Sequence, residues 1–169
     1  SLFAILIALP FGLAVAVYMS EVADHKIRNL MKPVIELLSG IPSVVYGFFG
    51  LIVIVPLLQR VFDLPVGESG LAGSIVLAIM ALPTIITVTE DAMRNCPRAM
   101  REASLALGAS QWQTIYKVVI PYSISGITSG VVLGIGRAVG ETMAVLMVTG
   151  NAAVIPHTIL EPLRTIPAT

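Results

Sequence analysis

The sequence has few of the side chains that usually carry chemistry. Only 12% of its residues are charged and 6% are aromatic, and it contains one cysteine and two histidines. The lone Cys96 excludes an internal disulfide and, with so few histidines, leaves little material for a metal site. The formal net charge is zero, so no basic surface indicates a nucleic-acid partner. We therefore expect no metal, no cofactor held by this chain and no nucleic acid.

Apolar side chains dominate what remains. The chain is 56% hydrophobic and has a mean hydropathy of +0.93, which is typical of an integral membrane protein. It begins inside an apolar run without an initiator methionine and stops in a polar stretch, so we expect a fragment of a longer protein. Residues 1–22 are too long an apolar run for a signal peptide and lack a cleavage signature.

Four apolar stretches are long enough to cross a bilayer, which takes about 20 residues of helix. The stretch from Asn151 to Thr169 is interrupted by prolines and is expected to lie outside the membrane. We predict an all-α, polytopic transmembrane helical bundle that forms a single domain over residues 1–169. Its spans are expected at about 1–22, 33–58, 69–89 and 123–149.

The second predicted span contains a helix-breaking cluster, Ser39-Gly40-Ile41-Pro42-Ser43. Broken backbone at membrane depth is tolerated only where protein or a water-filled path satisfies the freed polar groups. The cluster is therefore either an element of a solute pathway, with Ser39 and Ser43 as candidate lining residues, or a packed proline kink. The sequence favours neither over the other.

Polar residues also occur in and just after the third predicted span. Thr84, Thr87 and Thr89 are expected to form hydrogen bonds between helices or to the backbone rather than to bind a ligand. Glu90 and Asp91 follow directly and are expected to form a solvated helix end.

The fourth predicted span carries glycines at a helical spacing. Gly126, Gly130 and Gly134 form one series of small residues four apart, and Gly136 with Gly140 forms another. Such series let a neighbouring backbone approach closely. We expect this helix to pack against other helices through its glycines.

Residues 94–121 form the main polar interruption of the chain. A helix over Arg98–Leu107 is expected to end at Gly108, a natural C′ residue. Ser110 and Gln113 have the spacing of a capping box, which predicts that a second helix begins at once. Two short amphipathic helices should therefore meet at a glycine corner.

The first of these helices presents an apolar face suited to docking in the groove of another protein. Met100, Ala103 and Leu107 lie on that face, and Arg98 and Glu102 are expected to pair at i, i+4 beside it.

This stretch resembles the EAA loop of ABC importer permeases. The matching residues are Glu102, Ala103, Ser104, Gly108, Val118, Ile120 and Pro121, with Ser104 in place of the second alanine of the motif. The resemblance implies that the loop is a coupling element seated in a cytosolic ATPase subunit, which itself binds the ATP.

The distribution of basic residues predicts the orientation. Lys26, Arg28 and Lys32 follow the first span and Arg94, Arg98, Arg101 and Lys117 follow the third, against Arg60 and Arg164 in the other loops. The positive-inside rule places the first two groups in the cytoplasm of a multi-pass inner-membrane protein.

Arg137 and Glu141 are the ionisable residues deepest in a predicted span. An arginine at mid-membrane costs about 2.5–3.5 kcal/mol on insertion scales and needs a partner, which Glu141 could supply at i+4. By helical geometry Arg137 shares the face of Gly130. The pair, with the adjacent Thr142, either contributes to a solute pathway or pins helix to helix.

Two further motifs narrow the resemblance to the PstC-type permease subunit of phosphate importers. They are GIPSVVYGFFGL at Gly40–Leu51 and GRAVGETMAVLMVTGN at Gly136–Asn151. The resemblance implies a heterodimer with a PstA-type permease, two cytosolic ATP-binding cassette subunits, an extracytoplasmic phosphate-binding protein, and phosphate as the solute.

Other functions stay open at this stage. The solute could be another oxyanion, such as sulfate or molybdate, or a different small solute, and the chain could serve as a transport-linked signalling or scaffold subunit. An intramembrane enzyme is disfavoured because His25 and His157 lie outside the predicted spans and no paired intramembrane carboxylates occur.

Overall fold

The computed structural model describes residues 1–63, 67–151 and 158–162, and the helices in these ranges are joined by short links with no β-strand. This confirms the predicted all-α fold. Most of the segment expected outside the membrane, 151–169, lies outside the described residues. Three helical stretches are long and apolar enough to span a membrane, and a bent pair could form a fourth span.

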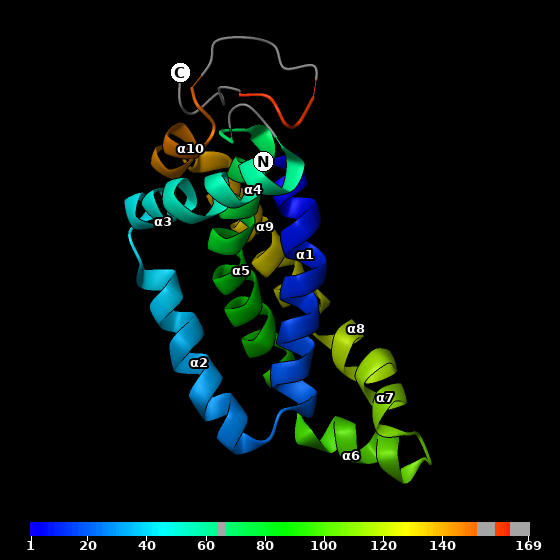
Figure 1. Cartoon of the computed structure of the whole chain (residues 1–169). Coiled ribbons are helices and arrows are strands. Elements are labelled where there is room, and N and C mark those ends of the chain that lie inside the picture. Colours follow the sequence, from blue (N-terminus) through cyan, green and yellow to red (C-terminus); the bar gives the residue numbers. More distant parts are fainter. Residues whose placement is uncertain (64–66, 152–157, 163–169) are drawn as a thin grey trace.

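The bundle is built around α5, Gly70–Arg94. About 61% of its most apolar window is buried, against 28% for each of the other two unbent candidate spans, Leu2–Val22 and Ser43–Phe62. In Figure 1, α1, α2 and α9 all run beside it. Its first turn is closed by the Ser69 hydroxyl, which accepts a hydrogen bond from the Ala72 amide at 3.2 Å.

The first span comprises α1, Leu2–Val17, continued by a π-helical turn η1, Tyr18–Val22. The buried residues of α1 are all small and recur every fourth position: Ala4, Ala8, Gly12 and Ala16. A Cβ at Gly12 would lie only 2.9 Å from a methyl carbon of Ile85 on α5. Small side chains thus bring α1 close to the central helix.

A neighbouring face of α5, which shares Ile85 with the α1 contact, receives α9, Ile124–Gly140, through the predicted glycine series. A Cβ on Gly126 would lie 2.2 Å from Ala92 Cβ, and one on Gly134 would lie 2.5 Å from Ile85 Cγ1. Gly130 is equally enclosed, since its Cβ would meet the hydroxyl of Thr89 at 3.0 Å. The prediction that these three glycines pack against a helix is confirmed.

The second glycine series does not pack within this chain. A Cβ on Gly136 or on Gly140 would meet no atom within 4 Å.

The predicted helix-breaking cluster at 39–43 interrupts the helix within the span expected over 33–58. The chain forms α2, His25–Gly40, leaves the helix at Ile41 and Pro42, and resumes as α3, Ser43–Phe49, η2, Gly50–Ile54, and α4, Val55–Phe62. Proline disfavours helical backbone in the residue before it, and Ile41 is extended with φ −68° and ψ 131°. The segment α3–η2–α4 lies across one end of the bundle (Figure 1).

The helix in the fourth predicted span, 123–149, is not continuous. α9 ends at Gly140, Glu141 is extended with φ −77° and ψ 125°, and a short α10 covers Met143–Val148. α10 packs on α3, where a Cβ on Gly47 would approach Ala144 Cα to 2.9 Å. Both chain breaks therefore lie at the same end of the bundle.

At the other end, α5 is followed by α6, Arg98–Ala106, and then by α7, Gln111–Thr114, η3, Ile115–Val119, and α8, Ile120–Tyr122. This corner projects away from the bundle (Figure 1). Gln111–Tyr122 forms one continuous helical stretch that meets α9 at an angle of 70°.

The glycine packing generates a matched pair of substitutions. Gly134→Ala should lower the thermal unfolding temperature, because the new Cβ overlaps Ile85. The Cβ added by Gly136→Ala points into open space. The second change should be neutral or stabilising, since alanine is favoured over glycine in helices by about 1 kcal/mol. Thermal unfolding of the two purified variants in detergent checks this, and equal melting temperatures would contradict it.

Candidate functional site

Arg137 lies in the last turn of α9 and joins three helices. Its guanidinium donates one hydrogen bond to the Thr84 hydroxyl of α5 and another to the Ser39 carbonyl of α2, both at 3.3 Å. Ser39 is in the final turn of α2, where carbonyls lack helical partners and the helix dipole favours a positive charge. The predicted interhelical role of Thr84 is confirmed.

The predicted ion pair between Arg137 and Glu141 is not formed. Because α9 ends at Gly140, Glu141 leaves the helical path that would have placed it one turn from Arg137. Its carboxylate instead accepts a hydrogen bond from the Ala144 amide, at 3.3 Å, in the first turn of α10. Among the described residues Arg137 thus has only uncharged partners.

The other predicted pathway residues border the same two breaks. Ser39 contributes its carbonyl to Arg137, Ser43 is the first residue of α3, and Thr142 directly precedes α10. The structure therefore places both broken helices beside each other but joins only Ser39 directly to Arg137.

Tyr46 is a further residue of this junction that the sequence did not reveal. It is buried in α3, and its hydroxyl donates to the Leu38 carbonyl of α2 at 2.7 Å. This bond fastens α3 back onto the end of α2, so that Tyr46 and Arg137 satisfy neighbouring carbonyls. The only sign of this role in the sequence was the position of the tyrosine, four residues after the helix-breaking Pro42.

The predicted glycine corner is confirmed in detail. Gly108 has a φ of +85°, and the amides of Gly108 and Ala109 donate to the carbonyls of Leu105 and Ser104, the pattern of a Schellman motif. Both hydrogen bonds of the Ser110–Gln113 capping box are present. The hydroxyls of Ser104 and Thr114 lie 3.0 Å apart and tie α6 to α7.

No residue of α6 is buried, so its outer face is free in this chain. Leu107 is 90% exposed, Met100 is 41% exposed, and Ala103 is also exposed. The predicted Arg98–Glu102 ion pair is absent from the part of the chain that the structure describes. Pairing two exposed side chains gains little free energy, which accounts for its absence.

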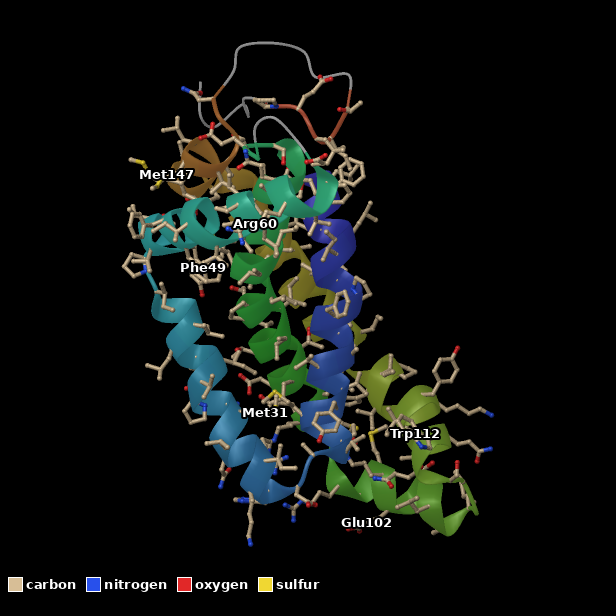
Figure 2. All side chains as sticks on the ribbon, viewed as in Figure 1. Met31, Phe49, Arg60, Glu102, Trp112 and Met147 are labelled. Atoms are coloured by element: carbon tan, nitrogen blue, oxygen red, sulfur yellow. The ribbon has the colours of Figure 1, made fainter. Side chains whose placement is uncertain are left out.

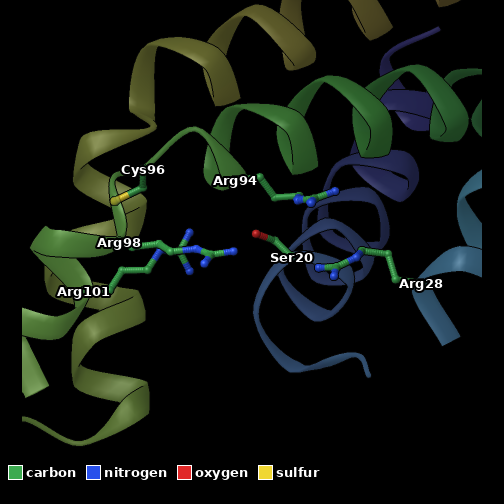
Figure 3. A pocket seen from close by; sticks show the side chains of 6 residues that line it. All are labelled: Ser20, Arg28, Arg94, Cys96, Arg98 and Arg101. Atoms are coloured by element: carbon green, nitrogen blue, oxygen red, sulfur yellow. The ribbon is translucent and has the colours of Figure 1, made fainter. Parts of the chain in front are cut away.

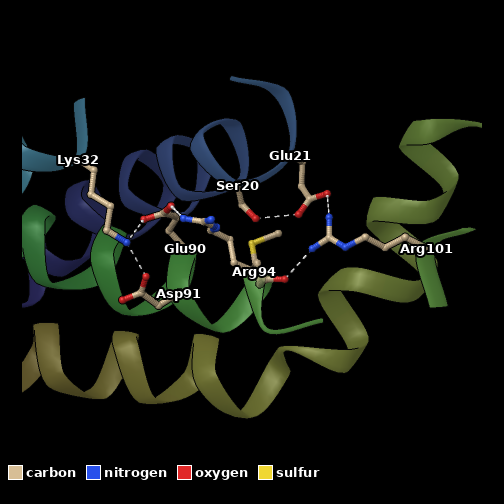
Figure 4. Close-up of polar contacts among 8 residues, drawn as sticks. Ser20, Glu21, Lys32, Glu90, Asp91, Arg94 and Arg101 are labelled. Carbon is tan, nitrogen blue, oxygen red and sulfur yellow. Dashed lines mark hydrogen bonds and ion pairs between the residues drawn. The ribbon is translucent and has the colours of Figure 1, made fainter. Parts of the chain in front are cut away.

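Arg101, which carried no predicted role, holds α6 to the bundle instead. It forms an ion pair with Glu21 of η1 and donates a hydrogen bond to the Met93 carbonyl at 2.8 Å (Figure 4). The Glu21 side chain is only 6% exposed and also accepts a hydrogen bond from Ser20.

The prediction of a solvated helix end at Glu90 and Asp91 is wrong for Glu90, which is fully buried. Lys32 Nζ lies 3.2 Å from one Glu90 oxygen and Arg94 Nη1 lies 3.6 Å from the other (Figure 4). These two cations are the charged partners of the buried Glu90 carboxylate among the described residues. Lys32 also bonds Asp91 at 2.7 Å, and this hydrogen bond raises the pKa of Lys32.

The Thr89 hydroxyl departs from the expected bonding. It is buried against Gly130 and forms no hydrogen bond with any described residue, because the close approach of α9 occupies the space around it.

The residues around Glu90 generate a second prediction. Lys32→Met should destabilise the protein, toward the low end of the about 3–5 kcal/mol expected when a buried charge loses a partner, because Arg94 remains. Replacing Glu90 by leucine as well should recover much of the loss, whereas Lys26→Met, at an exposed position, should have little effect.

Unfolding of these variants in mixed detergent micelles measures their free energies of unfolding. The folded-state pKa of Lys32 is raised, so its contribution is complete below the ordinary lysine pKa of about 10.4 and is lost as the pH rises through the raised value. Additive effects of Lys32→Met and Glu90→Leu would show that the two residues do not interact.

The long apolar helices, the two broken ones and the projecting corner define a polytopic α-helical membrane protein. A family model described as "Binding-protein-dependent transport system inner membrane component" matches residues 8–166, and the chain belongs to this family.

Relatives of this chain carry names in keeping with the family. It is 51% identical, over 90% of its length, to 49% of the "Probable ABC transporter permease protein YqgH" of Bacillus subtilis. It is 38% identical to the "Phosphate transport system permease protein PstC" of Mesorhizobium japonicum, over 100% of this chain and 58% of that protein. It is 36% identical to the "Phosphate transport system permease protein PstC" of Pasteurella multocida, over 96% of this chain and 57% of that protein. The chain thus spans about half the length of the curated relatives it matches.

Proposed function

We propose that this chain is part of the permease subunit of an ATP-driven importer that carries inorganic phosphate across the cytoplasmic membrane. The observation that carries the proposal is the position of Arg137, charged and held only by neutral groups, where two broken helices meet. The printed names of the PstC relatives support phosphate as the solute.

The chemistry of Arg137 suits an oxyanion. A guanidinium offers a planar fork that can form two charge-assisted hydrogen bonds with phosphate. Its present bonds to Thr84 and Ser39 are both 3.3 Å long, at the weak end of the usual range, so they can be exchanged. Conduction needs a site that the ion can leave. Once the anion has left, the Thr84 hydroxyl and the Ser39 carbonyl can again accept hydrogen bonds from Arg137.

The role expected for Glu141 changes with its position. In this conformation it does not compete with the anion for Arg137, because its carboxylate bonds the Ala144 amide of α10. We infer that Glu141 instead fixes the break between α9 and α10, and so the placement of Arg137, together with Thr142 at the same break.

The remaining parts of the proposal concern the partners. The end of the bundle that carries Arg28, Lys32, Arg94, Arg98 and Arg101, here called the basic end, is assigned to the cytoplasm by the positive-inside rule. The exposed face of α6 then faces a cytosolic ATPase subunit, which would bind and hydrolyse the ATP. A PstA-type second permease and an extracytoplasmic phosphate-binding protein complete the proposed importer.

Arg137→Lys tests the pathway. It keeps the charge but loses the fork, and losing one charge-assisted hydrogen bond of about 1.5–3 kcal/mol should slow phosphate uptake about tenfold or more. Arg60→Lys, an exposed arginine at the opposite end of the bundle from the basic end (Figure 2), is the matched control and should transport normally. Uptake is measured in the assembled complex at matched expression.

Arg137→Ala separates this function from the alternatives. Loss of uptake with normal assembly supports a pathway residue, and loss of assembly would indicate a structural pin between α2, α5 and α9. Wild-type uptake in this variant would end the proposal for Arg137. A comparison of phosphate, sulfate and molybdate in the same complex decides the solute.

Leu107→Ser tests the coupling corner. Leu107 is 90% exposed in this chain, so the change should leave its melting temperature unaltered while reducing phosphate uptake per ATP hydrolysed. Leu105→Ser, on the opposite side of α6, is the control and should stay coupled. Equal coupling ratios in both variants would contradict docking through the Met100–Ala103–Leu107 face.

A further inference from the structure

A small pocket at the basic end brings together four arginines from three helices. Its volume is about 220 Å³, and it is lined by Ser20, Arg28, Arg94, Cys96, Arg98 and Arg101. Figure 3 shows Arg98 and Arg101 reaching in from the α6 side and Arg28 from the opposite side, with Arg94 extending from the end of α5 toward Arg28. The pocket is separate from Arg137, whose partner on α5, Thr84, lies ten residues before Arg94, about 15 Å along the helix.

The positive charge of this pocket is only partly balanced. Arg101 is paired with Glu21, and Arg94 shares Glu90 with Lys32. Within the described ranges Arg28 and Arg98 form no ion pair, although Arg28 is only half-exposed. Bringing like charges together is unfavourable unless an anion joins them, since two unit charges near a protein surface still interact by a few kcal/mol at about 4 Å.

We propose that this pocket binds a phosphate-group oxyanion, either free inorganic phosphate or the phosphodiester of an anionic lipid headgroup. Guanidinium groups converging from different directions suit a tetrahedral anion with several acceptor oxygens, whereas a single carboxylate engages one fork. The volume lies below the roughly 300–1,000 Å³ typical of sites for drug-sized ligands, and no aromatic ring lines the pocket to stack on a base.

The occupant would connect α6 to the rest of the bundle. Ser20 belongs to η1, Arg28 to α2 and Arg94 to the end of α5, whereas Arg98 and Arg101 belong to α6. Arg98 is also the first residue of α6, so the positive end of that helix dipole lies at the pocket. An anion held here would reinforce the attachment that the Arg101–Glu21 pair already provides. The binding claim stands whether or not phosphate is the transported solute.

Equilibrium binding of radiolabelled inorganic phosphate to the purified full-length protein in detergent tests the site. Arg28→Gln and Arg98→Gln should each weaken binding about tenfold, the effect of losing one charge-assisted hydrogen bond. Neither change strands a buried carboxylate, because neither arginine has an ion-pair partner among the described residues. Arg60→Gln removes the same charge at the opposite end and should bind as wild type.

A second arm identifies the source of the phosphate group. The same variants are placed in nanodiscs of phosphatidylcholine with phosphatidylglycerol, and the phosphatidylglycerol retained on release is counted by native mass spectrometry. Retention lost in Arg28→Gln and Arg98→Gln but kept in Arg60→Gln, without saturable binding of free phosphate, assigns the site to a lipid headgroup.

If both pocket variants bind phosphate and retain phosphatidylglycerol as wild type does, the proposal is overturned and an acidic segment of another protein becomes the candidate occupant. Arg137→Gln is measured alongside, because loss of binding in that variant alone would assign the phosphate to the junction of broken helices and overturn the pocket. These measurements need no transport, so their failure is distinct from failure of the proposed importer function.

Discussion

The close contact of small residues with α5 is the constraint on which the rest of this structure depends. Alanines of α1 approach it on one face, and Gly126, Gly130 and Gly134 of α9 approach it on a neighbouring face that shares Ile85. In a bilayer, where lipid is as apolar as leucine, such close packing supplies the association that the hydrophobic effect supplies in water. Because α5 is enclosed along most of its length, the polar groups that it carries, Thr84 and Glu90, occupy fixed positions.

The two broken helices can exist because their exposed backbone groups find partners inside the protein. The last turn of α2 has carbonyls without i+4 helical partners, and those of Leu38 and Ser39 accept hydrogen bonds from the side chains of Tyr46 and Arg137. The first turn of α10 is closed by the Glu141 carboxylate. The anion site proposed at Arg137 would therefore arise from the same requirement that every buried backbone group be satisfied.

Features decided by neighbouring residues or by a regular spacing, such as the glycine series of α9, could be predicted from the sequence, whereas contacts between residues far apart in the chain could not. The glycine at Gly108 and the Ser110–Gln113 capping box are set by local backbone geometry, and both are present as predicted. The Arg137–Glu141 pair failed because an i, i+4 spacing matters only if the helix continues, and α9 stops between them. The burial of Glu90 depends on Lys32, far away in the sequence, which no local pattern reveals.

The same central helix joins the two charged regions of the molecule. Thr84, which holds Arg137, and Glu90, which holds Lys32 and Arg94, are fewer than two helical turns apart on α5. Glycine contacts as tight as those of Gly126 and Gly134 leave little room for α9 to bend or slide against α5. A displacement of α6 would reach α5 and η1 first, because Arg101 bonds the Met93 carbonyl of α5 and pairs with Glu21 of η1. The breaks after α2 and α9 are then the places where such a movement can be absorbed, and Arg137 lies between them.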